Sequence, residues 1–291
     1  MTTHYVHGYR SRENQRLQDQ ADTLLDLLHR DTRYPAGSTV LEAGCGVGAQ
    51  TLALARNSPY AHITSIDMSA ASIVQARRRI EEAGVTNVAF READILALPF
   101  GPQSFDHVFV CFVLEHLPAA ALALERLVAV LKPGGSLTVI EGDHGSTLFH
   151  PDSAAARASI DCLVQLQRRA GGDALIGRRL YPLLVQTGLE SICVEPRIVY
   201  VDASRPAWVD GFTNKTVIAM VEGVREDAVA AGLIDADRFD AGLHDLRRTT
   251  EGDGVFCYSF FKGVAHKDEP LRNLSAGGAG DLRHHSGLWR N

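Results

Sequence analysis

The amino-acid sequence predicts an α/β protein in which helices cover both faces of a parallel β-sheet. Three observations support this fold class. Short apolar segments typical of strands alternate with segments of helical periodicity between residues 39 and 143. The segment 105–112 is mostly apolar, as expected for a strand buried on both faces. A glycine-rich turn at 44–48 joins the first strand to the helix that follows, where such folds often hold a ligand.

The predicted elements follow one another with short turns. Leucine spacing predicts an amphipathic helix over 16–30, and a proline-glycine turn then breaks the chain. Helices are also expected at 49–57, 69–84 and 118–135. For the second of these, Ser69 is a suitable N-cap and Gly84 a suitable end. The strands expected in this half of the chain are 39–43, 62–67, 87–93, 105–112 and 136–143.

The regular alternation ends after residue 143. We expect a loop and an inserted helix over 144–172, a helix at 177–190 and a long strand at 191–202. Two helical stretches, 206–231 and 235–250, precede a final strand at 254–265. The predicted organisation is an N-terminal helical lid (1–34), a main domain (35–267) whose insertions 144–176 and 203–252 form a substrate cap, and a disordered tail (268–291).

Composition and charge exclude several classes of function. The net charge of −6 gives no general basic surface for nucleic acid. The longest apolar run, 108–114, is too short to cross a bilayer, and the N-terminus has no signal-peptide core, so we expect a cytoplasmic protein without a membrane partner. The five cysteines are scattered without a CxxC pair, which argues against a disulfide framework or a zinc site.

The glycine-rich turn predicts a ligand that lies against the backbone. Gly44, Gly46 and Gly48 remove side chains at the start of a helix, and Ala49 also completes the pattern of a dinucleotide site. Glu42 lies beside the turn, where it would repel a pyrophosphate and attract an ammonium or sulfonium group. S-adenosylmethionine carries both of these cations and no phosphate. The acid therefore favours this cofactor.

Two further acids follow the next two strands. Asp67 ends the second expected strand, where a carboxylate accepts hydrogen bonds from the two hydroxyls of a ribose. Asp94 follows the third strand, within reach of the exocyclic amine of an adenine. In a parallel sheet both acids and Glu42 lie at the same edge. Together they predict a site for an adenine nucleoside that bears a positive charge.

Five segments in order, "VLEAGCGVGAQT", "ITSIDMS", "READILALPF", "SFDHVFVCFVLEHL" and "LKPGGSLTVIEGD", resemble the motifs of class I S-adenosylmethionine-dependent methyltransferases. The resemblance implies a Rossmann-like, seven-stranded sheet whose last strand is antiparallel, and S-adenosylhomocysteine as the product. It implies that Gly44–Gly46 meet the methionine part and that Cys111 begins the segment beneath the sulfonium. The implied cofactor residues are Glu42, Gly44, Cys45, Gly46, Asp67, Met68, Asp94, Ile95 and Cys111.

The methyl acceptor is expected to lie among the insertions, because the cofactor site does not select it. These segments are rich in apolar and aromatic residues, which fits an apolar small molecule, although ordinary core packing explains them equally well. The N-terminal segment is a candidate lid, with Tyr9 and Gln20 over the cofactor. The candidate acceptor-binding residues are Tyr5, Phe149, Tyr181, Tyr200, Trp208 and Phe212.

Three titratable residues after the fifth strand are the candidates for acid–base catalysis. His144 is a candidate base, with Glu141 to orient it and His150 nearby, while "DHGS" is equally good turn chemistry. His116 follows the fourth strand and ranks lower. The histidines lack the close carboxylate spacing of a metal site, and we predict no metal.

The sequence leaves the reaction itself open among three hypotheses. The segments "EGDHG" and "FCYSFFK" resemble a subgroup of microbial methyltransferases that includes enzymes of teleocidin-type indole terpenoid biosynthesis. This implies C-methylation of a prenylated indole alkaloid with subsequent cation cyclisation. The alternatives are O- or N-methylation of a phenol, amine or quinone-like metabolite with His144 as base, and an NAD-dependent oxidoreductase. The N-terminal helix docks on its own core or on a second copy, which would make a homo-oligomer.

Overall fold

A computed structural model describes residues 23–269 of the 291-residue chain. The predictions for Tyr5, Tyr9 and Gln20, and nearly all of the predicted tail, lie outside the described residues. The described part contains a seven-stranded sheet with the order β3-β2-β1-β4-β5-β7-β6. The strands are β1 (Thr39–Ala43), β2 (His62–Asp67), β3 (Val88–Glu92), β4 (Phe105–Cys111), β5 (Leu131–His150), β6 (Glu190–Asp202) and β7 (Val255–His266).

The direction of the strands confirms the predicted fold class. β1 pairs in parallel with β2 and β4, β2 with β3, and β4 with β5. β7 inserts between β5 and β6 and is antiparallel to both. Because the parallel strands share one direction, the ends of β1, β2 and β4 meet at one edge of the sheet, which is where open α/β folds bind ligands.

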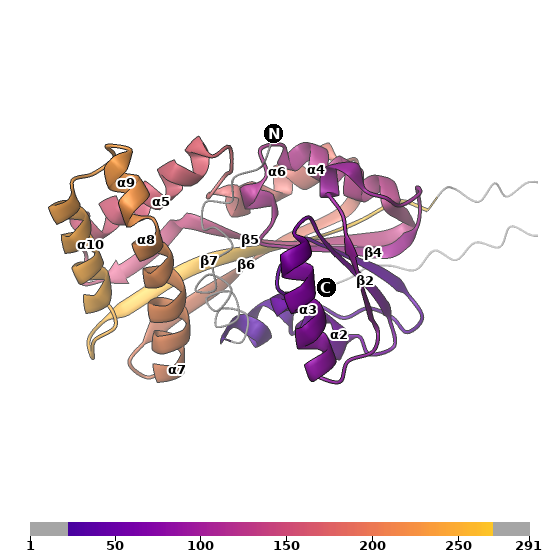
Figure 1. Ribbon diagram of the computed structural model, residues 1–291, viewed down its shortest axis with the longest axis horizontal. Coiled ribbons are helices and arrows are strands. Elements are labelled where there is room, and N and C mark those ends of the chain that lie inside the picture. The colour runs from indigo at the N-terminus through magenta and orange to yellow at the C-terminus, as the bar shows by residue number, and fades with distance from the viewer. Residues whose placement is uncertain (1–22, 270–291) are drawn as a thin grey trace, which may run out of the picture.

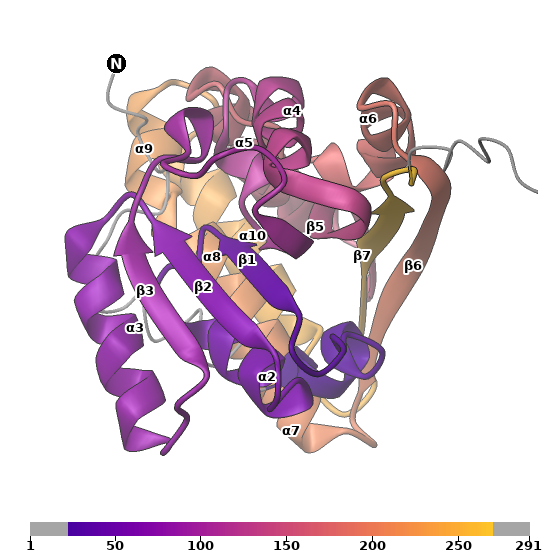
Figure 2. The same ribbon diagram turned by 90° about the vertical axis from the view of Figure 1, so that its right-hand side faces the viewer.

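Helices cover the sheet on both faces (Figure 2). α2 (Ala49–Asn57), α3 (Ala70–Glu82) and the helical residues 23–29 lie on one face. α4 (Ala120–Val130) and α6 (Leu180–Gln186) lie on the other. Two separate apolar cores result, one that includes Leu28 and Leu54 and one that includes Leu124 and Leu184. The sheet therefore has the two-sided burial that the apolar strands predict.

The prediction that the fifth strand ends at residue 143 was wrong. β5 continues to His150, because its pairing with β7 resumes at Leu148 after a register shift that begins at Asp143. β5, β7 and β6 therefore extend together beyond the rest of the sheet (Figure 1). This extension carries the second half of the molecule, so the inserted segments form a helical layer on a sheet and not a loop.

The helical layer covers one face of this extension (Figure 1). It consists of α5 (Ala154–Arg169), α7 (Pro206–Trp208), a π-helix η4 (Val209–Ile218), α8 (Ala219–Gly223), α9 (Arg225–Ala230) and α10 (Ala236–Arg248). π-helices are rare and are frequently found at functional sites. Gly211 in η4 lies against the side chain of Thr23. This contact joins the layer to the first described helix, which packs on its own core through Leu24 and Leu28.

Candidate active site

The three glycines of the turn after β1 have three different surroundings. All have positive φ angles of 79°, 50° and 78° in chain order. A Cβ atom on Gly44 would lie 2.5 Å from Val113, and one on Gly48 would lie 3.0 Å from the backbone of Ala76 in α3. A Cβ atom on Gly46 would meet nothing within 4 Å. The outer glycines therefore permit close packing, and the middle one leaves room against the backbone for a ligand.

Glu42 lies inside the protein beneath this turn and is 2% exposed. One carboxyl oxygen accepts hydrogen bonds from the hydroxyls of Thr51 at 2.7 Å and Ser65 at 2.5 Å. Burial raises the pKa of Glu42 to about 7, against the effect of both hydrogen bonds, and the charge of Asp67 adds to the rise. Any action of Glu42 on a cation is thus exerted through the turn, not by direct contact.

Asp67 ties the end of β2 to the glycine turn. Its two carboxyl oxygens accept hydrogen bonds from the backbone N–H groups of Gly46 and Ser69, each at 2.8 Å. A carboxylate has about four acceptor positions, so two remain for ribose hydroxyls. Asp94 is exposed and caps η1 (Ile95–Ala97) through the N–H of Leu96.

The remaining predicted cofactor residues lie along the same edge. Met68 is 51% exposed after β2, while Ile95 is buried at the start of η1. Cys45 is buried within the glycine turn, and Cys111 is buried at the end of β4. Burial raises the pKa of the Cys111 thiol, as do the nearby carboxyls, so this thiol is neutral and not a nucleophile.

Glu141 has a different role from the one predicted. Its side chain is fully buried, and one oxygen accepts hydrogen bonds from the N–H groups of Val113 at 3.0 Å and Leu114 at 2.7 Å. Burial raises its pKa well above the usual value, and the charge of Glu115 adds to this rise. A neutral, enclosed carboxyl that binds two backbone groups shapes the turn after β4. We therefore assign Glu141 as a positioning residue.

His144 lies within a buried polar network that joins three elements. Its Nδ1 lies 3.0 Å from the hydroxyl of Tyr258 in β7, and its Nε2 lies 3.4 Å from a carboxyl oxygen of Glu115. Glu115 belongs to η2 (Leu114–His116), where Gln167 donates to it at 3.3 Å. Burial opposes ionisation of Glu115, but the charge of His116 and the contact with His144 outweigh it, so its pKa is below the usual value. The network is therefore an ionised carboxylate, an imidazole and a phenol.

The predicted grouping of His150 with His144 was wrong. His150 is exposed at the end of β5, where it is the register partner of Val255. The register partners of Asp143 and His150 on β7, Ser259 and Val255, lie four residues apart, which is roughly 13 Å along the strand. Asp143, which precedes His144, is buried in a two-bond ion pair with Arg178 at 2.6 and 2.8 Å.

The predicted acceptor-binding aromatics do not form one group. Phe212 lies in a ring cluster with Phe256, Tyr258 and Phe260, at centroid distances of 5.8 to 6.2 Å. Phe149 stacks on Phe256 at the outer end of this cluster, at 6.3 Å. The cluster reaches the end of β4 through the contact of Phe260 with the ring at position 112, at 5.2 Å.

The other three candidates lie elsewhere. Tyr200 is exposed on the opposite face of β6, because its neighbours Val199 and Val201 face the core under the helical layer. Tyr181 is exposed on α6, on the far side of the sheet. Trp208 packs partly buried against the edge of the core. Tyr181 and Tyr200 therefore do not line a site with Phe212, contrary to the prediction.

Sequence reasoning missed two members of the polar network. Glu115 stands next to His116 in "LEHL", and this acid–histidine pair was an available signal. Tyr258 has the same strand parity as Phe256 and Phe260 in the last strand, which places it on the covered face. Neither signal shows that the two residues meet at His144, because the three belong to segments distant in sequence.

Within residues 23–269, no group of three or more histidine, cysteine or acidic side chains is arranged to hold a metal ion. No helix in this range is long and apolar enough to cross a membrane.

Comparison with known proteins identifies the family. Residues 35–186 match the sequence profile of the methyltransferase domain, and the chain therefore belongs to this family. It is 28% identical to 27-O-demethylrifamycin SV methyltransferase of Amycolatopsis mediterranei, over 84% of each chain. It is 33% identical to demethylmenaquinone methyltransferase of Listeria welshimeri, over 38% of this chain and 47% of that protein.

A solved structure supports the fold. The phosphoethanolamine N-methyltransferase 2 of Haemonchus contortus, in complex with S-adenosyl-L-methionine, matches with a TM-score of 0.53 and 18% identity, over 86% of this chain and 53% of that one. The protein is thus an S-adenosylmethionine-dependent methyltransferase, as the motifs predict, and not an NAD-dependent oxidoreductase.

The residues at the sheet edge fit this cofactor. Gly46 has open space where a Cβ atom would stand, and Asp67 offers acceptor positions next to it. The acids at 42, 67 and 94 suit a cationic nucleoside and oppose a pyrophosphate.

Proposed function

We propose that this enzyme methylates a hydroxyl group on an apolar, aromatic small-molecule metabolite, and that Tyr258, His144 and Glu115 receive the hydroxyl proton. The observation that carries the proposal is the buried carboxylate–imidazole–phenol network at the end of the sheet. Two relatives named for methylating demethylrifamycin and demethylmenaquinone support an acceptor of metabolite size. When bound, S-adenosylmethionine supplies the methyl group.

The protonation of the network follows from its neighbours. The ionised carboxylate of Glu115 only accepts hydrogen bonds, so Nε2 of His144 carries a proton. In a neutral imidazole Nδ1 is then the acceptor, and the hydroxyl of Tyr258 donates to it. One lone pair of the Tyr258 oxygen faces the backbone N–H of Asp143, and the other remains for a donor outside the network. An acceptor hydroxyl bound there would pass its proton to Tyr258 as the phenol proton moves to His144.

The surroundings of Tyr258 fit an apolar acceptor. Its ring contacts Phe260 at 4.7 Å and Phe212 at 5.8 Å, and it is 2% exposed. Burial raises the pKa of Tyr258 well above 10, and so does the charge of Glu115, which means that Tyr258 acts as a neutral relay and not as a phenolate. Glu115 stabilises the imidazolium that forms on His144.

The test is methyl transfer from labelled cofactor to a panel of phenols, hydroquinones, amines and prenylated indoles. With the best phenolic acceptor we expect Tyr258→Phe and His144→Gln to lower kcat roughly 100-fold or more, the usual contribution of positioned proton transfer. His150→Gln, at the exposed end of β5, is the matched control and should leave kcat unchanged. An unaltered kcat in Tyr258→Phe would contradict the proposed relay.

A second candidate is C-methylation of a prenyl side chain followed by cyclisation of the resulting cation. The ring cluster around Phe212 favours it, because the negative faces of aromatic rings stabilise a positive charge. The same panel separates the two candidates. A prenylated indole that gains a methyl group on carbon, at a rate indifferent to Tyr258→Phe, would support this second reaction.

A further inference from the structure

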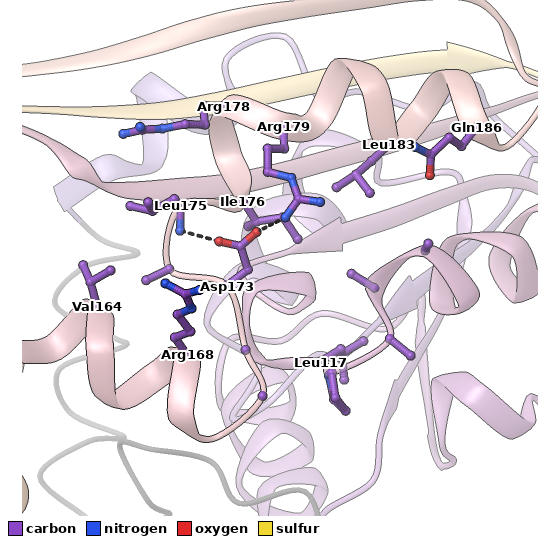
Figure 3. A pocket seen from close by; sticks show the side chains of 17 residues that line it. Leu117, Val164, Arg168, Asp173, Leu175, Ile176, Arg178, Arg179, Leu183 and Gln186 are labelled. Atoms are coloured by element: carbon purple, nitrogen blue, oxygen red, sulfur yellow. Dashed lines mark hydrogen bonds and ion pairs between the residues drawn. The ribbon is translucent and has the colours of Figure 1, made fainter. Parts of the chain in front are cut away.

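A groove outside the cofactor edge lies between the start of α4, the end of α5 and the segment that leads into α6 (Figure 3). Its volume is about 670 Å³, within the range of small-molecule sites. Arg168, Arg178 and Arg179 line it, and Asp173 is the only acidic residue in the lining. The groove is therefore positively charged, in a protein whose net charge is −6.

The three guanidinium groups differ in their partners. Arg178 is neutralised by Asp143, and Arg179 by Asp173. The guanidinium group of Arg168 makes no hydrogen bond or ion pair with another residue in the described part of the chain. It points into the groove from α5, while Arg179 reaches in from the opposite wall (Figure 3). The uncompensated guanidinium of Arg168 and the partly exposed one of Arg179 thus face the same space, an arrangement that suits a phosphate group.

Two helix ends meet at the groove, and the start of α4 favours an anion. α4 begins there with Ala119 as its N-cap and has no side-chain cap, so its first N–H groups have no partner from a cap. The carbonyl groups at the end of α5 would repel an anion. However, the N–H groups of residues 170–172 donate hydrogen bonds to the carbonyls of Leu166, Arg168 and Gln167. These carbonyls therefore already have partners at the groove.

The rest of the lining is apolar and indicates what the phosphate is attached to. Leu117, Val164, Leu175, Ile176 and Leu183 contribute side chains to the walls. Inorganic phosphate would leave these walls in contact with water. An organic phosphate with an apolar or aromatic body would cover them, which adds hydrophobic stabilisation to the charge contacts.

We propose that this groove is a second binding site, specific for a phosphate-bearing organic anion and separate from the methyl acceptor site. The groove is physically joined to the polar network. Gly172 packs on the carbonyl of Glu115, the N–H of Asp173 donates to that carbonyl at 2.8 Å, and the N–H of His144 donates to Ala174 at 2.9 Å. Residues 172–174 thus line the groove and also bind the backbone of Glu115 and His144. An anion in the groove would contact the segment that positions these two residues.

The test is calorimetric titration of the full chain with phenyl phosphate and, separately, with inorganic phosphate, at constant ionic strength. We expect saturable binding of phenyl phosphate that is tighter than that of inorganic phosphate. Arg168→Gln should weaken it roughly tenfold or more, the effect of one lost charge-assisted hydrogen bond. Arg169→Gln removes the same charge one residue further on, where the guanidinium binds the carbonyl of Ala231 outside the groove. It should change affinity less than twofold.

A second variant tests the site independently, in case Arg168→Gln loses binding because it folds poorly. Ala121→Glu places a carboxylate in the exposed first turn of α4, where it stabilises the helix and repels a phosphate. It should abolish binding. The proposal is overturned if phenyl phosphate does not saturate the wild-type chain, if inorganic phosphate binds equally well, or if Arg168→Gln and Arg169→Gln have equal effects.

Discussion

Glu42 gives a quantitative test of the electrostatics beneath the glycine turn. Its carboxyl is buried and held by the hydroxyls of Thr51 and Ser65, and its pKa is raised from 4.5 to about 7. A carboxyl whose pKa is raised by folding stabilises the native state while it is protonated. That contribution is complete below pH 4.5 and is lost as pH rises through 7. The free energy of unfolding should therefore fall with pH across this window.

The size of the fall follows from the two pKa values. Between pH 5 and pH 8, a shift from 4.5 to about 7 reduces the free energy of unfolding by about 2.5 kcal/mol. Glu42→Gln keeps an oxygen that can accept from Thr51 and Ser65 but cannot ionise. Between pH 5 and pH 8, the unfolding free energy of Glu42→Gln should therefore fall by about 2.5 kcal/mol less than that of the wild type.

The assay is urea denaturation followed by tryptophan fluorescence at pH 5 and pH 8. Glu81→Gln, which removes an exposed carboxyl from α3, is the matched control and should retain the wild-type pH dependence. If Glu42→Gln and Glu81→Gln show the same pH dependence as the wild type, Glu42 does not titrate near neutrality, and the reasoning about its burial fails.

Two further predictions concern packing. Gly44→Ala should destabilise the fold by about 2 kcal/mol or more, because its methyl group meets Val113 in a backbone conformation that disfavours alanine. Gly46→Ala should cost only about 1 kcal/mol in stability yet weaken S-adenosylhomocysteine binding, which calorimetry would measure. Phe212→Ala should destabilise by about 3–5 kcal/mol in thermal or urea unfolding, and Tyr200→Ala by less than about 1 kcal/mol, because only the first is buried. Equal effects within either pair would contradict the assigned environments.

The elements that the sequence predicted well are those defined by local signals. β1, α2 and β2 occupy the predicted residues, and Ser69 caps α3 as expected by accepting from the N–H of Ser72. Glycine spacing, apolar runs and N-caps act within a few residues, so they can be recognised without the fold. The end of β5 was not predictable in this way, because the segment 144–150 becomes a strand only through its partner β7.

The candidate site also has a part that local signals predict and a part that they do not. The acids at 42, 67 and 94 could be placed at one sheet edge, because each directly follows or ends a parallel strand and all such ends coincide. Which side chains join His144 could not be predicted. Glu115 comes from the turn after β4 and Tyr258 from an antiparallel strand more than a hundred residues later in the chain.

By itself, therefore, the sequence determined the order of strands and helices, the glycine turn and the cofactor, because short-range patterns encode each of them. The tertiary structure alone decided which face of β6 carries Tyr200, how far β5 extends, and that an acid, an imidazole and a phenol meet under the helical layer. These features depend on strand register and on contacts between distant segments. Register turns each side chain toward the core or the solvent, and it depends on the partner strand as well as on the local pattern.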